Sequence, residues 1–192
     1  NFMSNAFDAR FYDRHVADVA QRLIGAALSL DGVGGMIVET EAYDRDDPAS
    51  HSFAGATARN AAMFGPAGHA YVYRSYGLHW CFNIVCRPGA AVLVRALEPV
   101  SGIPAMIRRR GMEDLRSLCS GPGKLCQALA IGGEHNGLPL AHGSLRLEPP
   151  DRSHAVVTGT RIGISKARDQ DWRFGLAESK FVSRAFPKTS GR

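Results

Sequence analysis

The chain has 192 residues, enough for one domain with a sizeable core, and we expect a single domain over residues 1–192. Its 45% hydrophobic and 21% charged residues are typical of a globular protein, and no apolar run approaches the ~20 residues of a membrane span. The formal net charge of +5 favours a polyanionic partner, although a basic protein of another class could carry the same excess.

The first half of the chain predicts one helix followed by β structure. Residues 13–24 have the apolar spacing of an amphipathic helix that Asp13 could cap and Gly25 could end. Residues 26–43 read as two strands around Asp31-Gly32, a strong hairpin signal. Residues 44–66 are polar and small, which is typical of a loop. The apolar helix face comprises Val16, Val19, Ala20, Leu23 and Ile24.

The second half mixes short strands with two helices. A β ribbon is expected at residues 71–73 and 80–85, connected near Tyr76-Gly77, and another strand at 90–97. Pro99 should begin a helix that ends at Arg110-Gly111, and Pro122 a helix that runs to Ala130. Further short strands are expected around residues 145–148, 156–164 and 181–183, and residues 188–192 should fray. This order predicts an α+β fold with a mostly antiparallel sheet.

The four cysteines are Cys81, Cys86, Cys119 and Cys126, and they form no C-x-x-C pair. All lie among apolar residues, so we expect buried thiols in a reducing compartment. The first residues lack the charged and apolar regions of a signal peptide. We therefore expect an intracellular protein, without metal or cofactor, in the bacterial cytoplasm and nucleoid or the eukaryotic nucleus.

One predicted strand carries two glutamates and a tyrosine on the same face. Alternation along residues 37–43 places Glu39, Glu41 and Tyr43 together. Two neighbouring carboxylates can form an acid–base site, because a close like charge raises the pKa of one of them. The alternative is a merely solvated face, which strand glutamates usually form.

The predicted β ribbon carries an aromatic residue at its turn. Tyr76 has little core to fill there, so it could enter a base stack and fill the gap left by a flipped base. Tyr71 and Tyr73 share a face, where they could contact a base or simply pack across strands. Packing is the stronger alternative for Tyr71.

Three further features could bind phosphate or a base. Arg95 interrupts an apolar strand and needs a partner, either a phosphate or an intramolecular carboxylate. The segment from Ser120 through Gly121 to Lys124 opens a helix and could hold a phosphate on its N–H groups, but it lacks the Walker pattern and could be an ordinary helix start. His51 lies in a loop, where a single histidine is more often structural than catalytic.

Taken together, these segments resemble the alkyladenine (3-methyladenine) DNA glycosylase family. The similarity runs from about residue 11 to residue 183, in the family's order and at similar spacing. Residues 132–144 match no part of the family pattern, and residues 172–180 look less regular than the family's usual closing strand. The matching segments are Val38–Tyr43, His51-Ser52, Arg59-Asn60, Met63-Phe64, Tyr71–Tyr73, Tyr76-Gly77, Cys81–Ile84, Val94–Pro99 and Leu118–Leu129.

The resemblance implies a role for each matching residue. Glu41 would be the general base that activates water; Tyr76 would intercalate into DNA. The base pocket would comprise Tyr43, His51, Tyr73 and Asn83, with Asn83 crowding the exocyclic amine of guanine. Contacts with DNA would come from Arg95, Ser120, Gly121 and Lys124.

The resemblance also implies a fold, a reaction and a partner. The fold is one α+β domain with a curved, mostly antiparallel sheet, flanking helices and a protruding β hairpin that intercalates into DNA. The reaction is DNA repair: a monomer flips an alkylated or deaminated purine out of double-stranded DNA and hydrolyses its N-glycosidic bond, without a cofactor.

Three other functions are compatible with parts of the sequence. A non-catalytic nucleic-acid binding module would share the basic charge and the aromatic hairpin, but would have no use for Glu41. A bifunctional glycosylase-lyase would use Lys124 as a Schiff-base nucleophile, which requires an apolar pocket rather than a Gly/Pro-rich segment. A metal-dependent hydrolase would need a ligand cluster. The preferred lesion stays open among 3-methyladenine, 7-methylguanine, hypoxanthine and ethenoadenine.

Overall fold

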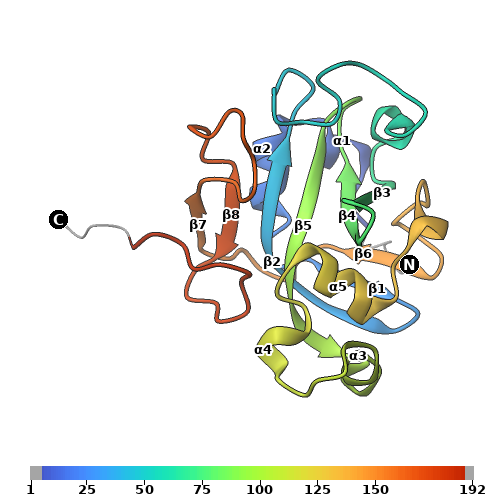
Figure 1. The fold of residues 1–192 in the computed structure, drawn as a ribbon, viewed down its shortest axis with the longest axis vertical. Coiled ribbons are helices and arrows are strands. Elements are labelled where there is room, and N and C mark those ends of the chain that lie inside the picture. The colour runs from blue at the N-terminus through green and yellow to red at the C-terminus, as the bar shows by residue number, and fades with distance from the viewer. Residues whose placement is uncertain (1–5, 189–192) are drawn as a thin grey trace.

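A computed structural model describes residues 6–188. Its centre is one curled antiparallel sheet, with the strand order β3-β4-β5-β2-β1-β6 and with β8 joining β2 to β7 (Figure 1). The strands are β1 (Ala27–Leu30), β2 (Val33–Tyr43), β3 (Ala70–Ser75), β4 (His79–Val85), β5 (Ala91–Ser101), β6 (Leu145–Glu148), β7 (Val156–Gly159) and β8 (Arg173–Leu176). The predicted α+β class is confirmed. Except for residue 188, the expected frayed end lies outside the described residues.

The N-terminal helices lie against the middle of the sheet. The short α1 (Ala9–Tyr12), which was not predicted, precedes α2 (Val16–Arg22). The predicted apolar face of α2 is buried, and the Thr40 hydroxyl of β2 donates a hydrogen bond to the Ala20 carbonyl at 2.9 Å. Asp13 does not cap α2, because it ends α1; the His15 imidazole accepts the Ala17 N–H instead.

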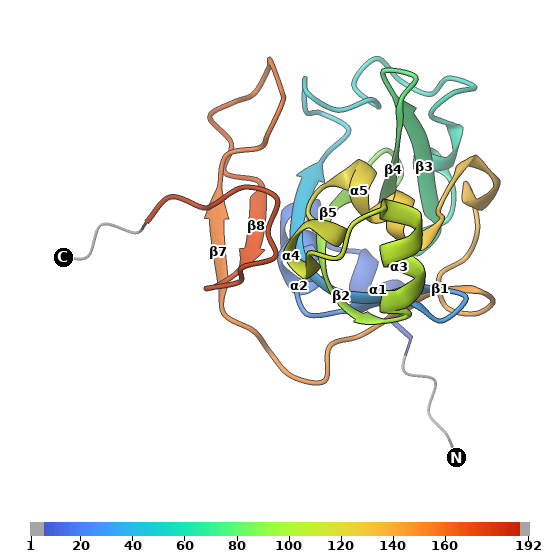
Figure 2. The same cartoon turned by 60° about the horizontal axis from the view of Figure 1, so that its bottom comes forward.

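The remaining helices gather at one end of the sheet, where Figure 2 brings them forward. They are α3 (Ile103–Arg110), α4 (Leu115–Leu118) and α5 (Pro122–Leu129), while the 3-10 turns η1 (Ala61–Phe64) and η2 (Gly133–His135) lie in loops. Pro99 lies in β5 and begins no helix: the ladder with β2 shifts register beside it, so its missing N–H is tolerated. The helix after Pro122 and the end of α3 at Gly111 are as predicted.

The two predicted hairpins form. Asp31 and Gly32 join β1 to β2 with φ of 49° and 80°. Tyr76 and Gly77, with φ of 50° and 66°, join β3 to β4 together with Leu78. Both pairs have the positive φ that a type I′ turn requires. The hairpins therefore follow from local turn chemistry.

Of the strands predicted near the C-terminus, that at residues 156–164 is shorter than expected and that at residues 181–183 is absent. β7 ends at Gly159, because the next backbone N–H groups leave the ladder and Ile162 donates to Glu41 instead. Residues 181–183 form no strand; the Ser183 N–H donates to the Glu39 carboxylate. Residues 172–180, which look less regular in sequence than the family's closing strand, contain β8, and β8 pairs with β2 at Glu39 and Glu41.

The hydrophobic core has one large cluster that joins the sheet to α2 and α5, and a smaller cluster of Met63, Tyr71, Val85 and Ala91. All four cysteines are buried free thiols within or beside it, as expected. Within residues 6–188 no helix is both long and apolar enough to cross a bilayer.

Candidate active site

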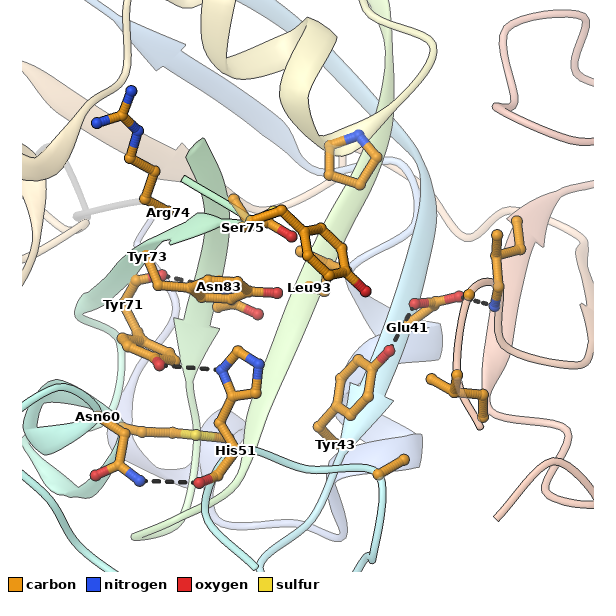
Figure 3. Close-up of a pocket in the computed structure, with 18 of the residues that line it drawn as sticks. Glu41, Tyr43, His51, Asn60, Tyr71, Tyr73, Arg74, Ser75, Asn83 and Leu93 are labelled. Atoms are coloured by element: carbon orange, nitrogen blue, oxygen red, sulfur yellow. Dashed lines mark hydrogen bonds between the residues drawn. The ribbon is translucent and has the colours of Figure 1, made fainter. Parts of the chain in front are cut away.

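A cavity of about 910 Å³ opens between the β3–β4 hairpin, the end of β2, the loop after β2 and the loop after β7 (Figure 3). Seven of the predicted site residues line it: Glu41, Tyr43, His51, Tyr73, Tyr76, Asn83 and Arg95. Because the sheet curls, side chains from strands β2 to β5 converge on one hollow. A nucleobase fits the size range of such a pocket.

Glu41 lies in the wall of this cavity with a fully buried side chain. Its carboxylate accepts hydrogen bonds from the Tyr43 hydroxyl at 2.9 Å and from the Ile162 N–H at 2.7 Å. Figure 3 shows the Tyr43 hydroxyl pointing directly at the carboxylate. Burial raises the pKa of Glu41, while the charge of Arg95 and the two hydrogen bonds oppose the rise. The like charge of Glu39, which the sequence suggested as the cause, makes the smallest contribution.

Glu39 is buried too, but it lies outside the cavity lining. It accepts a hydrogen bond from Arg173 at 3.0 Å, and Ser183 donates to it with both its N–H and its hydroxyl. The alternative of a solvated glutamate face is therefore wrong, since both carboxylates have no exposed surface. One carboxylate faces the cavity and the other is bound within the protein.

Arg95 lies between the two carboxylates. Its guanidinium nitrogens approach Glu39 and Glu41 at 3.5 Å each, and its side chain is 11% exposed. Of the two partners that the sequence left open, the intramolecular one is present. A DNA contact by Arg95 remains a prediction.

Aromatic side chains and an imidazole form the opposite wall. The His51 ring packs edge-on against Tyr73 with centroids 4.4 Å apart, and its Nδ1 lies 3.2 Å from the Tyr71 hydroxyl. Burial and the nearby Arg59 charge lower the pKa of His51, so the imidazole is neutral at pH 7. Burial raises the pKa of Tyr71 to about 12 and raises those of Tyr43 and Tyr73 further, so the phenols stay protonated. Tyr71 packs as expected, and its hydroxyl also reaches the cavity.

Asn83 and Tyr76 occupy the two ends of the β3–β4 hairpin. Asn83 is paired with Tyr71 and donates a side-chain hydrogen bond to the Tyr71 carbonyl at 3.1 Å, which fixes its amide in the cavity wall. Tyr76 lies at the turn with 92% of its surface exposed. A non-glycine residue with positive φ is strained. Nothing within residues 6–188 covers the Tyr76 ring.

The segment that opens α5 lies beside the cavity. Ser120 forms an isolated bridge with Ala96, Gly121 is the N-cap of α5, and Lys124 is exposed. Of this segment, only Pro122 lines the hollow. The structure therefore places Ser120, Gly121 and Lys124 outside the pocket wall, and phosphate binding by them stays a prediction.

Sequence reasoning missed Arg161 and its partner Asp47, which support Tyr43 from behind. The Arg161 guanidinium lies 4.8 Å from the Tyr43 ring centroid and 5.4 Å from that of Trp172, and pairs with the Asp47 carboxylate with no exposure on either side chain. It also donates to the Ala42 carbonyl at 3.0 Å. An arginine inside an apolar strand pattern, the signal that singled out Arg95, could have found it.

The loop after β2 is held over the cavity by its own side chains. Asn60 donates to the His51 carbonyl at 2.9 Å and to the Gly55 carbonyl at 3.1 Å. Arg59 donates to the Arg74 carbonyl at 3.1 Å and so ties the loop to the β3–β4 hairpin. His51 is thereby fixed in place before any ligand binds. Among the described residues, no group of three histidines, cysteines or acids could hold a metal ion.

Comparison with known proteins shows the family to which the chain belongs. The family model described as methylpurine-DNA glycosylase matches residues 10–180. The chain belongs to this family. As a methylpurine-DNA glycosylase it is a hydrolase that acts on N-glycosyl bonds in DNA, and the alternative of a non-catalytic binding module is wrong.

Bacterial relatives of this glycosylase match over nearly their whole length. A protein of Agrobacterium fabrum is 60% identical over 176 residues, which are 92% of this chain and 91% of the relative. A protein of Nitrosospira multiformis is 61% identical over 88% of this chain and 89% of its own, and one of Rhizobium meliloti is 59% identical over 93% and 97%. All three carry the provisional name 3-methyladenine DNA glycosylase.

Proposed function

We propose that this glycosylase flips an alkylated purine out of double-stranded DNA into the cavity and hydrolyses its glycosidic bond with water activated by Glu41. The observation that carries this proposal is a buried carboxylate facing a hollow walled by Tyr43, His51 and Tyr73. The enzyme acts inside the cell as a monomer, without a cofactor, and leaves an abasic site.

The proposed reaction depends on the charge of the damaged base. Alkylation at a ring nitrogen makes the purine cationic, so the bond electrons leave with the base while positive charge develops on the sugar. Glu41 takes a proton from water as the water oxygen bonds to C1′. Its raised pKa suits this role, because a stronger base accepts the proton more readily once it is ionised. Tyr43 and Arg95 hold the carboxylate oriented.

New contacts in the cavity must offset the free-energy cost of flipping, because extruding a base from the duplex costs a few kcal/mol. Stacking on Tyr43 and Tyr73 would return roughly 1–3 kcal/mol per aromatic ring. Asn83 would crowd the exocyclic amine of guanine and so exclude the normal base. The DNA backbone would be held by the positive charges of Arg95 and Lys124 and by the start of α5 at Ser120 and Gly121. The affinity for DNA should therefore fall as the salt concentration rises.

The direct test is base release from duplexes that each carry one lesion. We expect the wild-type protein to release an alkylated purine, to leave the strand intact until alkali is added, and to be unaffected by EDTA. Strand cleavage without alkali, together with borohydride trapping that Lys124→Ala abolishes, would establish the glycosylase-lyase alternative. No release from any of 3-methyladenine, 7-methylguanine, hypoxanthine and ethenoadenine duplexes would refute the proposed function.

Replacing Tyr76 by alanine should weaken base flipping while the fold is kept. The ring is exposed and no described residue covers it, so its loss removes only the stacking that fills the gap in the duplex, about 1–3 kcal/mol. A fluorescent base analogue at the lesion reports the flipping equilibrium. Tyr76→Phe, which keeps the ring, and Val100→Ala, at another exposed apolar residue, should behave as wild type. An unchanged flipping equilibrium in Tyr76→Ala would rule out the intercalating role.

A further inference from the structure

Four charged side chains form a buried cluster in which Glu41 and Arg95 line the cavity, while Glu39 and Arg173 lie outside its lining. Arg95 lies between Glu39 and Glu41, and Arg173 donates to Glu39 at 3.0 Å. Neither contact of Arg95 is short, because both N–O distances are 3.5 Å, and its buried Nε has no hydrogen-bond partner. The Arg95 guanidinium is therefore shared between the two carboxylates and the Ser183 hydroxyl, to which it donates at 3.5 Å. A change in the other hydrogen bonds to Glu39 changes how closely Arg95 can stay to Glu41.

A segment near the C-terminal end of the described residues supplies two hydrogen bonds to Glu39. In the closing segment, residues 181–186, Ser183 donates its N–H to Glu39 Oε1 at 2.6 Å and its hydroxyl to Oε2 at 3.0 Å. The carbonyls of Arg184 and Ala185 accept hydrogen bonds from Arg173 at 3.1 and 3.4 Å. This segment lies just beyond residue 180, where the family match ends.

Phe186 fixes the closing segment in place. Its ring lies 3.7 Å from the Arg173 guanidinium and rests against Gly159 and Gly175 of the β7–β8 ribbon. A side-chain carbon at Gly175 would overlap the ring, and one at Gly159 would lie 3.2 Å from it. The two glycines therefore leave a slot that the ring fills, and the segment is docked at a defined position.

We propose that Ser183 and Glu39 are positioning residues for the general base Glu41. Ser183 donates two hydrogen bonds to Glu39, so that Arg95 stays shared between Glu39 and Glu41. This inference rests on the proposed function. Without the Ser183 hydroxyl, Glu39 would lose a donor and Arg95 an acceptor, so Arg95 would move closer to Glu39 and Glu41 would lose part of its countercharge. The closing segment thus acts on the reaction through Arg95, without touching the substrate.

The charges around Glu41 give the sign of the effect. Glu39 and Tyr43 face it from its own strand, Arg95 from β5 and Cys81 from β4, while Arg173, its register partner on β8, directs its charge to Glu39. Burial raises the pKa of Glu41, and Arg95 is the largest opposing influence. A base works only when ionised, so the single-turnover rate falls as pH drops through this pKa. Weakening the Arg95 contact raises the pKa again and moves the acid limb to higher pH.

The experiment compares the pH dependence of single-turnover base release by Ser183→Ala, Phe186→Ala and wild-type protein on an alkylated duplex. We expect the midpoint of the acid limb to rise by about 0.5 pH unit or more in both variants, with a plateau near the wild-type rate at high pH. Ser183→Thr, which keeps the hydroxyl, should restore the wild-type midpoint. Arg184→Gln is the matched control, because it removes an exposed charge from the same segment and keeps the carbonyl that Arg173 uses.

The possible outcomes distinguish a positioning role of the closing segment from a purely structural one. Denaturant unfolding of each variant gives the folded fraction, so that rates are compared per folded molecule. A rate lowered equally at every pH, or a midpoint unchanged in both variants, would overturn the positioning role while leaving the proposed function standing. Failure of the wild-type protein to release any base would instead overturn the proposed function and this inference with it.

Discussion

Replacing Glu41 by glutamine is expected to lower the single-turnover rate of base release by at least about 10²–10⁴-fold, the usual contribution of a general base. Glutamine keeps the shape and an oxygen that can accept the Ile162 N–H, so the local structure should persist. The variant should still bind and flip the damaged base, since the walls formed by Tyr43 and Tyr73 are unchanged. Quenched-flow release on an alkylated duplex measures the rate, and fluorescence anisotropy the binding.

Glu148→Gln is the matched control for that experiment. Glu148 lies on β6, where it is exposed and outside the cavity lining. The same substitution there should leave the rate of base release equal to that of the wild type. Turnover by Glu41→Gln within about tenfold of wild type would remove Glu41 from the role of base. Loss of lesion binding in the same variant would show that the carboxylate serves binding rather than chemistry.

Replacing Arg161 by methionine is expected to lower the free energy of unfolding by about 3–5 kcal/mol, because it leaves the Asp47 carboxylate buried without its partner. The carbonyl of Ala42 also loses a donor. Tyr43 loses the guanidinium packed on its ring, so lesion binding should weaken in the protein that remains folded. Urea unfolding with an unchanged slope measures the stability loss.

The same substitution at a surface ion pair provides the comparison. Arg22 pairs with Asp18 at 3.1 Å along α2, but both side chains are about half exposed, and Arg22→Met should cost about 0–1 kcal/mol. Adding Asp47→Leu to Arg161→Met should recover part of the loss, because the uncompensated charge is then gone. A loss below about 1 kcal/mol in Arg161→Met would show that water or another group replaces the arginine.

Local patterns in the sequence predicted the elements whose cause is local. The hairpin at Asp31-Gly32 follows from residues that accept positive φ, and the start of α5 from Pro122. The apolar face of α2 was predictable because helical periodicity alone selects it. The helix predicted to begin at Pro99 was wrong, because a proline can also lie in a strand where the ladder shifts register, and that shift depends on β2.

The sequence by itself also determined which residue types share the face of β2, since alternation puts Glu41 beside Tyr43. Only the tertiary structure decided the partners of these groups. The Ile162 N–H that reaches Glu41 is 121 residues away, Asp47 and Arg161 are 114 apart, and Glu39 and Ser183 are 144 apart. A buried charge must find a partner, but its identity depends on which distant segments the curled sheet brings together, and spacing along the chain carries no such information.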